Sequence, residues 1–471
     1  MLLSISAICI APLHAALAHA QDDRALAVLA PALRESLRST GLPASAFAIV
    51  VRPLGKHGMN VAFNDAVPMS PASTMKLVTT YAALELLGPA FRWRTEAFAA
   101  GALHDDVLEG DLVVRGGGDP KLVVENLWSL VQRIRAYGLR EIRGDVVLDR
   151  SAFEPLLHDP AQFDGEPLRP YNTGPDPLLL NFKTLSFAFV PDSDSRTVRV
   201  VVSPPVAGLR WPALLSAVEG PCNDWRAQLQ ADFASPLEPV FRGTFPLSCG
   251  ERVWNVSVLD HATYFGAVFR ALWEGANGTW SGKVRDGATP PEARRIAVNY
   301  SPPLGEVVRD INKFSNNVMA RQLFLTLSAD SMGPAASTDR SARLVTDWLA
   351  RRSISMPELV LDNGSGLSRL ERATAAGMAR LLVAAFEGPL MPEFMASLPL
   401  VNVDGLTRSR STAAGSAHMK SGQLVDVRSQ AGYVRTARGR RYVLVVFVNH
   451  EKAGDGQPFL DFILDWLYLN G

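Results

Sequence analysis

The chain has 471 residues, too many for one ordinary hydrophobic core, so two or three domains are expected. Hydrophobic residues make up 47% and charged residues 20%, a globular composition without a low-complexity tract. Basic and acidic residues balance at 47 each, which excludes a general electrostatic attraction to nucleic acid or to anionic membranes.

The first 20 residues form an apolar run that ends in Ala18-His19-Ala20, a small-x-small pattern that suits signal peptidase. This pattern predicts a secretory signal peptide over 1–20, although the usual basic residues before the apolar run are missing. A buried first helix is the alternative. No later segment approaches the ~20 apolar residues of a membrane span, so no transmembrane helix is expected in the mature chain.

Residues 21–91 are expected to form the first part of an α+β domain. Helical periodicity over 24–40 stops at a glycine, and two β-patterned runs follow, joined around Gly55–Gly58. The next helix is expected over about 72–87, where a Gly-Pro pair ends it.

From 92 to 296, short β-patterned runs alternate with proline-rich connections, and one helix is expected over 124–138. This pattern predicts an inserted, strand-rich region, which could itself be two nested domains. Its inner part contains Cys222 and Cys249, the two cysteines that remain once the signal is removed. Two cysteines in an exported chain predict one disulfide, and two buried free thiols are the alternative.

Residues 297–471 are expected to complete the α+β domain. Helical patterns cover 304–329, 337–352 and 374–386, a hairpin turns at Arg438-Gly439-Arg440, and a last amphipathic helix covers 458–469. The order of these elements predicts an antiparallel sheet covered by the two terminal helices, with the region 92–296 spliced into it.

A lysine lies one helical turn from a serine at the start of the helix expected over 72–87. Ser73 and Lys76 share a helix face at positions i and i+3, so the amine can reach the hydroxyl. A serine hydroxyl needs a base within hydrogen-bond reach, and Lys76 can be that base if burial or a second cation lowers its pKa from about 10.4. Alone this signal is weak, since about half a Ser-x-x-Lys match is expected by chance. A surface lysine beside an incidental serine is the alternative.

Two further stretches strengthen the signal. Ser315-Asn316-Asn317 lies at the start of an expected helix, and Lys420-Ser421-Gly422 lies just before the predicted hairpin. Alone, the first could be a helix N-cap and the second a turn. Together with Ser73 and Lys76, in this order, they form the signature of the active-site-serine penicillin-recognising enzymes. Composition alone would produce the whole set less than about once in a hundred such chains.

Four of these residues are expected to assist Ser73 in an acyl transfer. Lys76 takes the proton of the hydroxyl, and Lys420 supplies a second cation that helps to keep Lys76 neutral. Ser315 can pass a proton to the leaving amine, and Asn317 can bind both Lys76 and the substrate amide.

The third motif is expected to bind the substrate. Lys420 and the hydroxyl of Ser421 can attract a terminal carboxylate, and Gly422 leaves the strand edge open to a peptide. The backbone N–H groups of Ser73 and Gln423 are expected to form the oxyanion hole.

These motifs resemble those of the D-alanyl-D-alanine carboxypeptidase/endopeptidase family, the class C low-molecular-mass penicillin-binding proteins (peptidase S13). The resemblance covers nearly all of the mature chain and includes the stretches 71–89, 110–120, 144–153, 362–369 and 397–410. It implies a serine β-lactamase/DD-peptidase-like fold and a periplasmic enzyme that removes D-Ala from peptidoglycan stem peptides. Such enzymes often also cleave D-Ala–diaminopimelate crosslinks, and penicillins and other β-lactams acylate their serine.

The chain departs from the family in its third motif, which reads Lys-Ser-Gly-Gln where Lys-Thr-Gly-Thr is common. Ser421 keeps a hydroxyl, but Gln423 loses one and adds bulk beside the oxyanion hole. The substrate preference, and the balance between carboxypeptidase and endopeptidase activity, are therefore left open.

Other candidate sites are weaker. The glycine-rich run at 115–120 lacks the Gly-Lys-Ser/Thr of a phosphate loop, and the histidines show no ligand spacing, so no metal or cofactor is expected. Asp362 and Asp404 lie in glycine-containing turns, where an aspartate is most often a local cap, and are given no catalytic role. The alternative functions are a β-lactamase or esterase of the same fold and a non-catalytic peptidoglycan-binding scaffold.

Overall fold

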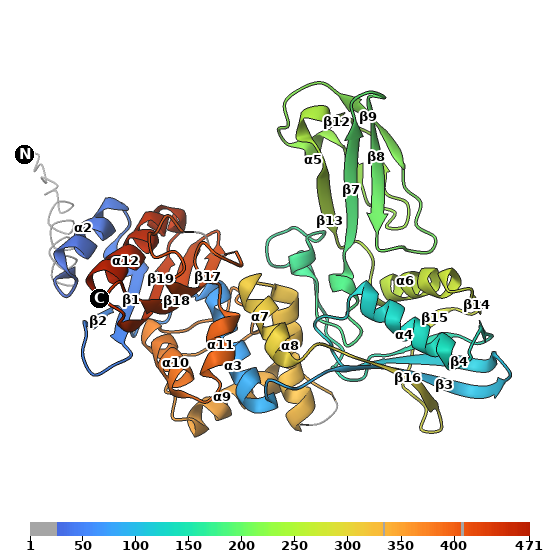
Figure 1. The fold of residues 1–471 in the computed structure, drawn as a ribbon, viewed down its shortest axis with the longest axis horizontal. Helices are drawn as coiled ribbons and strands as arrows, with labels where there is room; N and C mark the ends of the chain where they lie inside the picture. The colour runs from blue at the N-terminus through green and yellow to red at the C-terminus, as the bar shows by residue number, and fades with distance from the viewer. Residues whose placement is uncertain (1–25, 333–334, 407–408) are drawn as a thin grey trace, which may run out of the picture. The chain divides into compact units, whose positions relative to one another are not determined.

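The computed structural model describes residues 26–332, 335–406 and 409–471, and the predicted signal peptide lies outside them. The chain divides into two compact units (Figure 1). Unit 1 comprises Met1–Pro89, Val308–Asn317 and Ala342–Gly471, and unit 2 comprises Ala90–Val307 and Val318–Ser341. The domain limits of 92 and 296 expected for the insert stay a prediction.

Unit 1 is built on a five-stranded antiparallel sheet in the order β17-β18-β19-β1-β2. Its strands are β1 (Phe47–Pro53), β2 (Val61–Phe63), β17 (Ala417–Leu424), β18 (Val427–Arg435) and β19 (Arg441–Asn449). The central strands β1 and β19 are buried along nearly their whole length, because helices cover both faces of the sheet.

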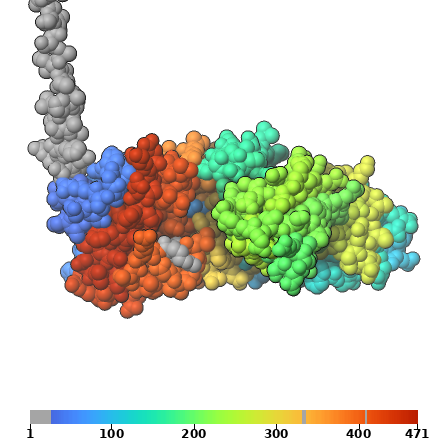
Figure 2. Space-filling model, turned by 90° about the horizontal axis from the view of Figure 1, so that it is seen from above, coloured from blue at the N-terminus to red at the C-terminus, as the bar shows by residue number. Residues whose placement is uncertain are grey.

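Helices from the two ends of the described chain lie together on one face of this sheet. They are α2 (Pro31–Ser39) and α12 (Gln457–Asn470), and Figure 1 and Figure 2 both show the blue α2 segment beside the red α12 segment. Leu33 of α2 and Ile463 of α12 share a core cluster with alternate residues of β1 such as Ile49.

The other face of the sheet is covered by α10 (Ala375–Glu387), which contacts β1 and β19. Behind α10 lie α3 (Lys76–Leu87) and α11 (Met391–Ser397), and the ring of Tyr81 on α3 packs edge-on against Trp348 of α9 (Thr338–Arg351). The antiparallel sheet between helical layers confirms the predicted α+β class.

Unit 2 contains two larger sheets and a two-stranded ladder. The seven-stranded sheet has the order β14-β5-β4-β3-β16, with β6 pairing both β4 and β15, and the five-stranded sheet has the order β12-β9-β8-β7-β13. The strands of the first sheet are β3 (Arg94–His104), β4 (Val107–Gly116), β5 (Glu141–Ile142), β6 (Val146–Asp149), β14 (Thr279–Trp280), β15 (Val284–Asp286) and β16 (Arg294–Tyr300). The others are β7 (Leu185–Asp192), β8 (Thr197–Ser203), β9 (Leu214–Val218), β12 (Phe245–Pro246), β13 (Arg252–Val256) and the ladder β10 (Ala231–Asp232) with β11 (Val240–Phe241).

One hydrophobic core joins the sheets of unit 2 to its helices. The helices that contribute residues to this core are α4 (Val124–Ala136), the short α5 (Trp225–Gln228) and α6 (His261–Gly275). Leu130 of α4 and Phe269 of α6 belong to the same buried cluster as Leu112 of β4 and Phe187 of β7. A disulfide joins Cys222 and Cys249 in this unit.

Two expectations about helices were wrong. The region 92–296 contains α6 in addition to the predicted helix, and the fifteen residues of α6 begin after Asp260, whose carboxylate caps the helix by accepting from Thr263 N. In the described part of the helix expected over 24–40, Leu26 is helical, residues 27–30 are not, and α2 begins at Pro31, since a proline has no N–H to donate and so suits the first turn of a helix.

The helical pattern over 304–329 is broken in the middle. α7 (Leu304–Lys313) ends before Phe314, and α8 (Asn317–Met332) begins three residues later. Between them Ser315 has a left-handed backbone, with φ of 52°. Within the described part of the chain, no helix is long and apolar enough to cross a membrane.

Candidate active site

The predicted nucleophile lies in a tight turn at the start of α3. Ser73 belongs to a 3₁₀ turn (Ala72–Met75) that continues directly into α3 at Lys76. The side chain of Lys76 is fully buried, and its Nζ donates to Ser73 Oγ over 3.0 Å. The i, i+3 spacing therefore brings amine and hydroxyl together on one face, within reach for proton transfer.

Lys76 has two further oxygen partners in unit 1. Its Nζ donates to Asn317 Oδ1 at 2.6 Å and to the carbonyl oxygen of Ser365. Three acceptors around one amine hold the lysine in a single orientation toward Ser73. Asn317 thus lies beside Lys76, and so does Ser365, which the sequence analysis did not single out.

Lys420 binds the other predicted residue of the second motif. It lies on β17 with 1% of its surface exposed, and its Nζ donates to Ser315 Oγ at 2.9 Å and to Ser421 O at 2.7 Å. Burial lowers the pKa of Lys420 to about 7, so near neutral pH it exchanges between charged and neutral forms. As a second cation it therefore acts mainly below this pH.

The turn that carries Ser315 and Asn317 is anchored from α7. Lys313 Nζ donates to Leu398 O at 3.0 Å and to Asp404 Oδ2 at 2.5 Å. Burial by itself would raise the pKa of Asp404, but the hydrogen bonds from Lys313 and Leu400 N lower it. Asp404 is thus more than the local cap expected from the sequence, since it fixes the helix end that precedes the second motif.

Gly422 brings β17 against the nucleophile turn. A Cβ at Gly422 would lie 2.8 Å from Ser73 N and would also collide with Ser429 Oγ. Only glycine therefore allows this approach. Ser429 Oγ donates to Pro71 O at 2.7 Å, which ties β18 to the same turn.

The predicted substrate-binding residues line a cavity of about 590 Å³ in unit 1. Ser421 is partly buried there and Gln423 is exposed. The remaining lining residues come from β18, from α12 and the turn before it, and from the segment before β17, and they include Arg410 and Arg428. Arg428 is engaged with the backbone, because its Nη1 donates to Leu424 O at 2.7 Å and to Val427 O at 2.9 Å.

Sequence reasoning missed the carboxylate that shapes the loop around Ser365. Glu371 is buried and accepts from the backbone N–H groups of Gly364 and Gly366, each at 2.7 Å, and of Asn363 at 3.1 Å. Burial raises its pKa, and the backbone N–H groups oppose this effect. The only hint of this loop in the sequence was the Gly/Asn/Ser-rich stretch 362–369, which resembles the family. That stretch does not reveal which later residue binds its backbone N–H groups.

Gly366 explains why this loop can approach the nucleophile. Its backbone is left-handed, with φ of 79°, and a Cβ would collide with Ala72 O and lie 2.7 Å from Ser73 N. Loop and nucleophile turn are therefore in backbone contact, with Ser365 O directed at Lys76. Among the described residues, no group of three or more His, Cys, Asp or Glu side chains could hold a metal ion.

Comparisons with known proteins assign the chain to a family. The model of the D-Ala-D-Ala carboxypeptidase 3 (S13) family matches residues 29–464. A D-alanyl-D-alanine carboxypeptidase of Actinomadura sp. is 30% identical over 81% of this chain and 73% of its own length. The D-alanyl-D-alanine carboxypeptidase DacB of Haemophilus influenzae is 24% identical over 86% of each chain.

A solved structure shares the fold over most of the chain. The crystal structure of penicillin-binding protein 4 (dacB) from Haemophilus influenzae has a TM-score of 0.75 and 22% identity, and the match covers 90% of this chain and 96% of that one. The chain therefore belongs to the S13 family of D-Ala-D-Ala carboxypeptidases. It is a serine peptidase of the penicillin-binding class.

Proposed function

We propose that Ser73 is the nucleophile of a D-Ala-D-Ala peptidase and that Lys76 is its base. The observation that carries this proposal is the position of Lys76 Nζ, which bonds to Ser73 Oγ at 3.0 Å and to Asn317 Oδ1 at 2.6 Å in a fully buried position. A buried amine beside a hydroxyl is the arrangement that activates a serine.

The reaction follows from these contacts. Ser73 Oγ attacks the carbonyl carbon of the scissile peptide bond while its proton passes to Lys76 Nζ, and the N–H groups of Ser73 and Gln423 bind the resulting oxyanion. The C–N bond then breaks as Ser315 passes a proton to the leaving amine, a step for which Lys420 is the neighbouring donor. Water attacks the acyl-enzyme ester and releases the shortened peptide.

The substrates that fit this proposal are peptidoglycan stem peptides that end in D-Ala-D-Ala, and crosslinks in which the leaving amine belongs to diaminopimelate. Lys420 and Ser421 would bind the carboxylate next to the scissile bond. The exposed Gln423 stands where the family commonly has threonine, and we infer that it changes the preference among these substrates. We further propose export by the signal peptide 1–20 and action in the periplasm.

Acylation by penicillin tests the assignment of the nucleophile. We expect labelled penicillin to add to the wild type and the covalent adduct to fall by at least about a thousandfold in Ser73→Ala, because the variant lacks the hydroxyl to which Lys76 bonds. Ser39→Ala, on the exposed side of α2, is the matched control and should label like the wild type. Equal labelling of Ser73→Ala and the control would refute the proposal.

Product analysis separates the proposed peptidase from its rivals. Purified crosslinked muropeptides, read by mass spectrometry, should lose D-Ala or separate at the crosslink. A β-lactamase would instead turn penicillin over rapidly, and a scaffold would bind muropeptides without changing their mass.

A further inference from the structure

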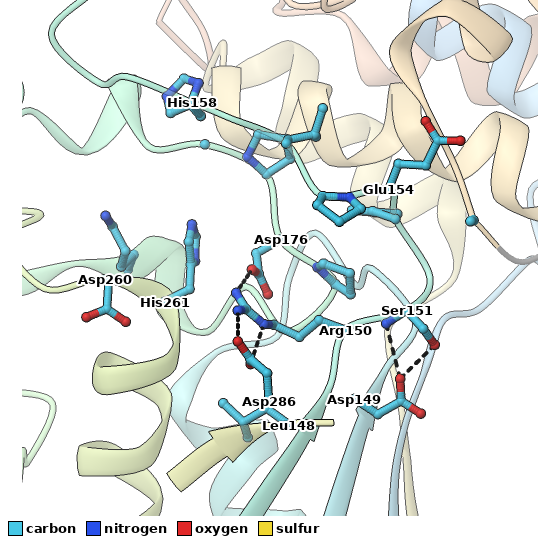
Figure 3. A pocket seen from close by; sticks show the side chains of 18 of the residues that line it. Leu148, Asp149, Arg150, Ser151, Glu154, His158, Asp176, Asp260, His261 and Asp286 are labelled. Carbon is cyan, nitrogen blue, oxygen red and sulfur yellow. Dashed lines mark hydrogen bonds and ion pairs between the residues drawn. The ribbon is translucent and has the colours of Figure 1, made fainter. Parts of the chain in front are cut away.

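Unit 2 contains a cavity of about 730 Å³, a volume in the range of small-molecule binding sites (Figure 3). All of its lining residues belong to unit 2. Much of the wall is apolar and includes Leu148, Phe153 and the prolines Pro155, Pro160, Pro175 and Pro177. Figure 3 shows Asp260 and His261 on one side, at the start of α6, with Arg150 and Asp176 at the centre and Glu154 on the far side.

The acidic residues of the lining are already bound to groups of the protein. Arg150 donates to Asp176 Oδ2 at 2.6 Å and to both carboxylate oxygens of Asp286. The other carboxylates accept from neighbouring hydroxyl, N–H or guanidinium groups: Asp149 from Ser151 and Thr289, Asp260 from Thr263, and Glu154 from Arg340. A cation in the cavity would therefore have to compete for carboxylates that are already in use.

Lys183 is the opposite case. It lines the cavity and is partly buried, yet its ammonium has no hydrogen bond or ion pair within the described part of the chain. Burial lowers the pKa of Lys183, and the more distant Asp260 and Asp176 oppose this effect. A partly buried cation without a direct partner is costly to retain, which points to an anion supplied from outside.

The backbone that carries Lys183 is held in an unusual conformation. Asn181, Phe182 and Lys183 have φ values of 46°, 54° and 53°, a left-handed run that costs on the order of 1 kcal/mol per residue. Tyr264 of α6 fixes this turn, since its hydroxyl donates to Thr184 O at 2.6 Å and accepts from Asn181 Nδ2 at 3.3 Å. The lysine is thus held at the cavity by a braced turn, which is a common feature of binding sites.

His261 adds a second unsatisfied group. It is the first residue of α6, and its Nδ1 is buried without a partner among the described residues. Burial lowers the pKa of His261 to about 4, so the ring is neutral at pH 7 and can donate or accept one hydrogen bond at each nitrogen. The start of a fifteen-residue helix also favours negative charge nearby.

We propose that this cavity binds a short peptide by its free carboxylate, which pairs with the ammonium of Lys183 beside His261. The proline and phenylalanine wall contacts the aliphatic part of the peptide, and the cavity volume suits two or three small residues. The site does not depend on the reaction at Ser73. The choice of an alanyl peptide as ligand does rest on the function proposed above, since peptides of this kind surround such an enzyme.

Calorimetric titration of the full chain with D-alanyl-D-alanine tests the proposal. The protein is first acylated with penicillin, so that Ser73 is blocked, and the adduct is verified by mass. We expect one peptide to bind, the C-terminal amide of the same dipeptide to bind at least about tenfold more weakly, and Lys183→Met to weaken binding of the acid by a similar factor. Lys183→Arg should restore most of the affinity.

The matched control is Lys283→Met, which removes a lysine of unit 2 that does not line the cavity and should leave the affinity unchanged. Equal binding of acid and amide to the wild type would overturn the proposal, and this comparison needs no variant to fold. Absence of binding, or wild-type affinity in Lys183→Met, would overturn it as well. Failure of the function proposed for Ser73 would appear earlier, as a missing penicillin adduct, and the titration would still test the cavity.

Discussion

Two regions of this molecule hold lysines out of water, and they do so in different ways. In unit 1, Lys76 and Lys420 are almost fully buried, and oxygen atoms of the protein surround each ammonium. In unit 2, Lys183 is only partly buried, and its ammonium has no direct partner among the described residues. A lysine that must transfer a proton needs a fixed orientation, whereas a lysine that binds an anion needs an open place beside it.

The largest expected effect is on the rate of acylation in unit 1. Lys76→Met should slow acylation of Ser73 by penicillin by about a thousandfold, about 4 kcal/mol in activation free energy, because the methionine keeps the volume but cannot accept the proton. The first-order rate of acylation, followed by mass spectrometry at saturating penicillin, measures this.

Lys56→Met is the matched control, since Lys56 lies exposed in the loop between β1 and β2 of the same unit. It should acylate at the wild-type rate. If Lys76→Met acylated within threefold of this control while remaining folded, the base would have to be another group. Lys76 would then no longer be an example of a lysine oriented for proton transfer.

The second prediction concerns the carboxylate that holds the loop against Lys76. In Glu371→Gln, one oxygen that accepts from a buried backbone N–H becomes an NH₂ group facing that N–H, which should lower the free energy of unfolding by about 2 kcal/mol. Acylation should slow as well, because Ser365 O belongs to the same loop and accepts from Lys76. Urea unfolding and the acylation rate measure the two effects.

Glu35→Gln, on the exposed side of α2, should change neither quantity. A Glu371→Gln variant as stable as this control would show that relief of the buried charge balances the lost acceptor, since burial raises the pKa of Glu371. The loop would then be held by its other contacts.

Lys76 and Glu371 also show which candidate residues sequence reasoning can name and which it cannot. Ser73, Lys76, Ser315, Asn317 and Lys420 could be named in advance because each lies in a short motif whose spacing has a chemical meaning. Glu371 could not, because its ligands are backbone N–H groups that only the folded loop 362–366 brings to one point. The same holds for Lys183, whose role depends on a turn that Tyr264 braces from another part of the chain.

The fold shows a similar division. The α+β class and the strands β1, β2, β18 and β19 follow from hydrophobic periodicity and turn residues, whereas the segment with Lys420 was expected only to precede the hairpin and forms β17. α6 was missed because its sequence is rich in aromatic and β-branched residues, which are equally typical of strands, so that burial within unit 2 decides its conformation. The start of α2 at Pro31 was missed because apolar periodicity continues on both sides of the proline.

A smaller effect is expected at Lys420, and its dependence on pH is the diagnostic. The pKa of Lys420 is about 7 when folded and about 10.4 when unfolded, so between these values the unfolded chain binds more protons. The wild type should therefore gain up to about 1.4 kcal/mol in free energy of unfolding per pH unit through this window. Lys420→Met should lack this gain, which urea unfolding at pH 6.5, 8 and 9.5 would reveal.

The lost hydrogen bonds to Ser315 and Ser421 change the free energy of unfolding of Lys420→Met by an amount that does not depend on pH. The slope of the free energy of unfolding against pH, and not its absolute value, therefore reports the pKa of Lys420. Lys56→Met is again the control and should keep the wild-type slope. Parallel curves for the wild type and Lys420→Met would mean that Lys420 keeps its proton when buried, and that it acts as a permanent cation beside Ser315.

The smallest effect on the free energy of unfolding is expected at Lys183, and its pH dependence can be compared directly with that of Lys420. Burial lowers the pKa of this lysine too, so the free energy of unfolding of the wild type should again rise as the pH rises toward 10.4. The gain should be smaller than the gain through Lys420, because Lys183 keeps contact with water and is attracted by Asp260 and Asp176. Lys183→Met loses no hydrogen bond of its ammonium among the described residues, so its free energy of unfolding at pH 6.5 should equal or exceed that of the wild type, by less than about 1 kcal/mol. The same urea series, with Lys283→Met as control, measures this. A clear loss of stability in Lys183→Met would show that the ammonium has a structural partner, and the cavity would then need no external anion.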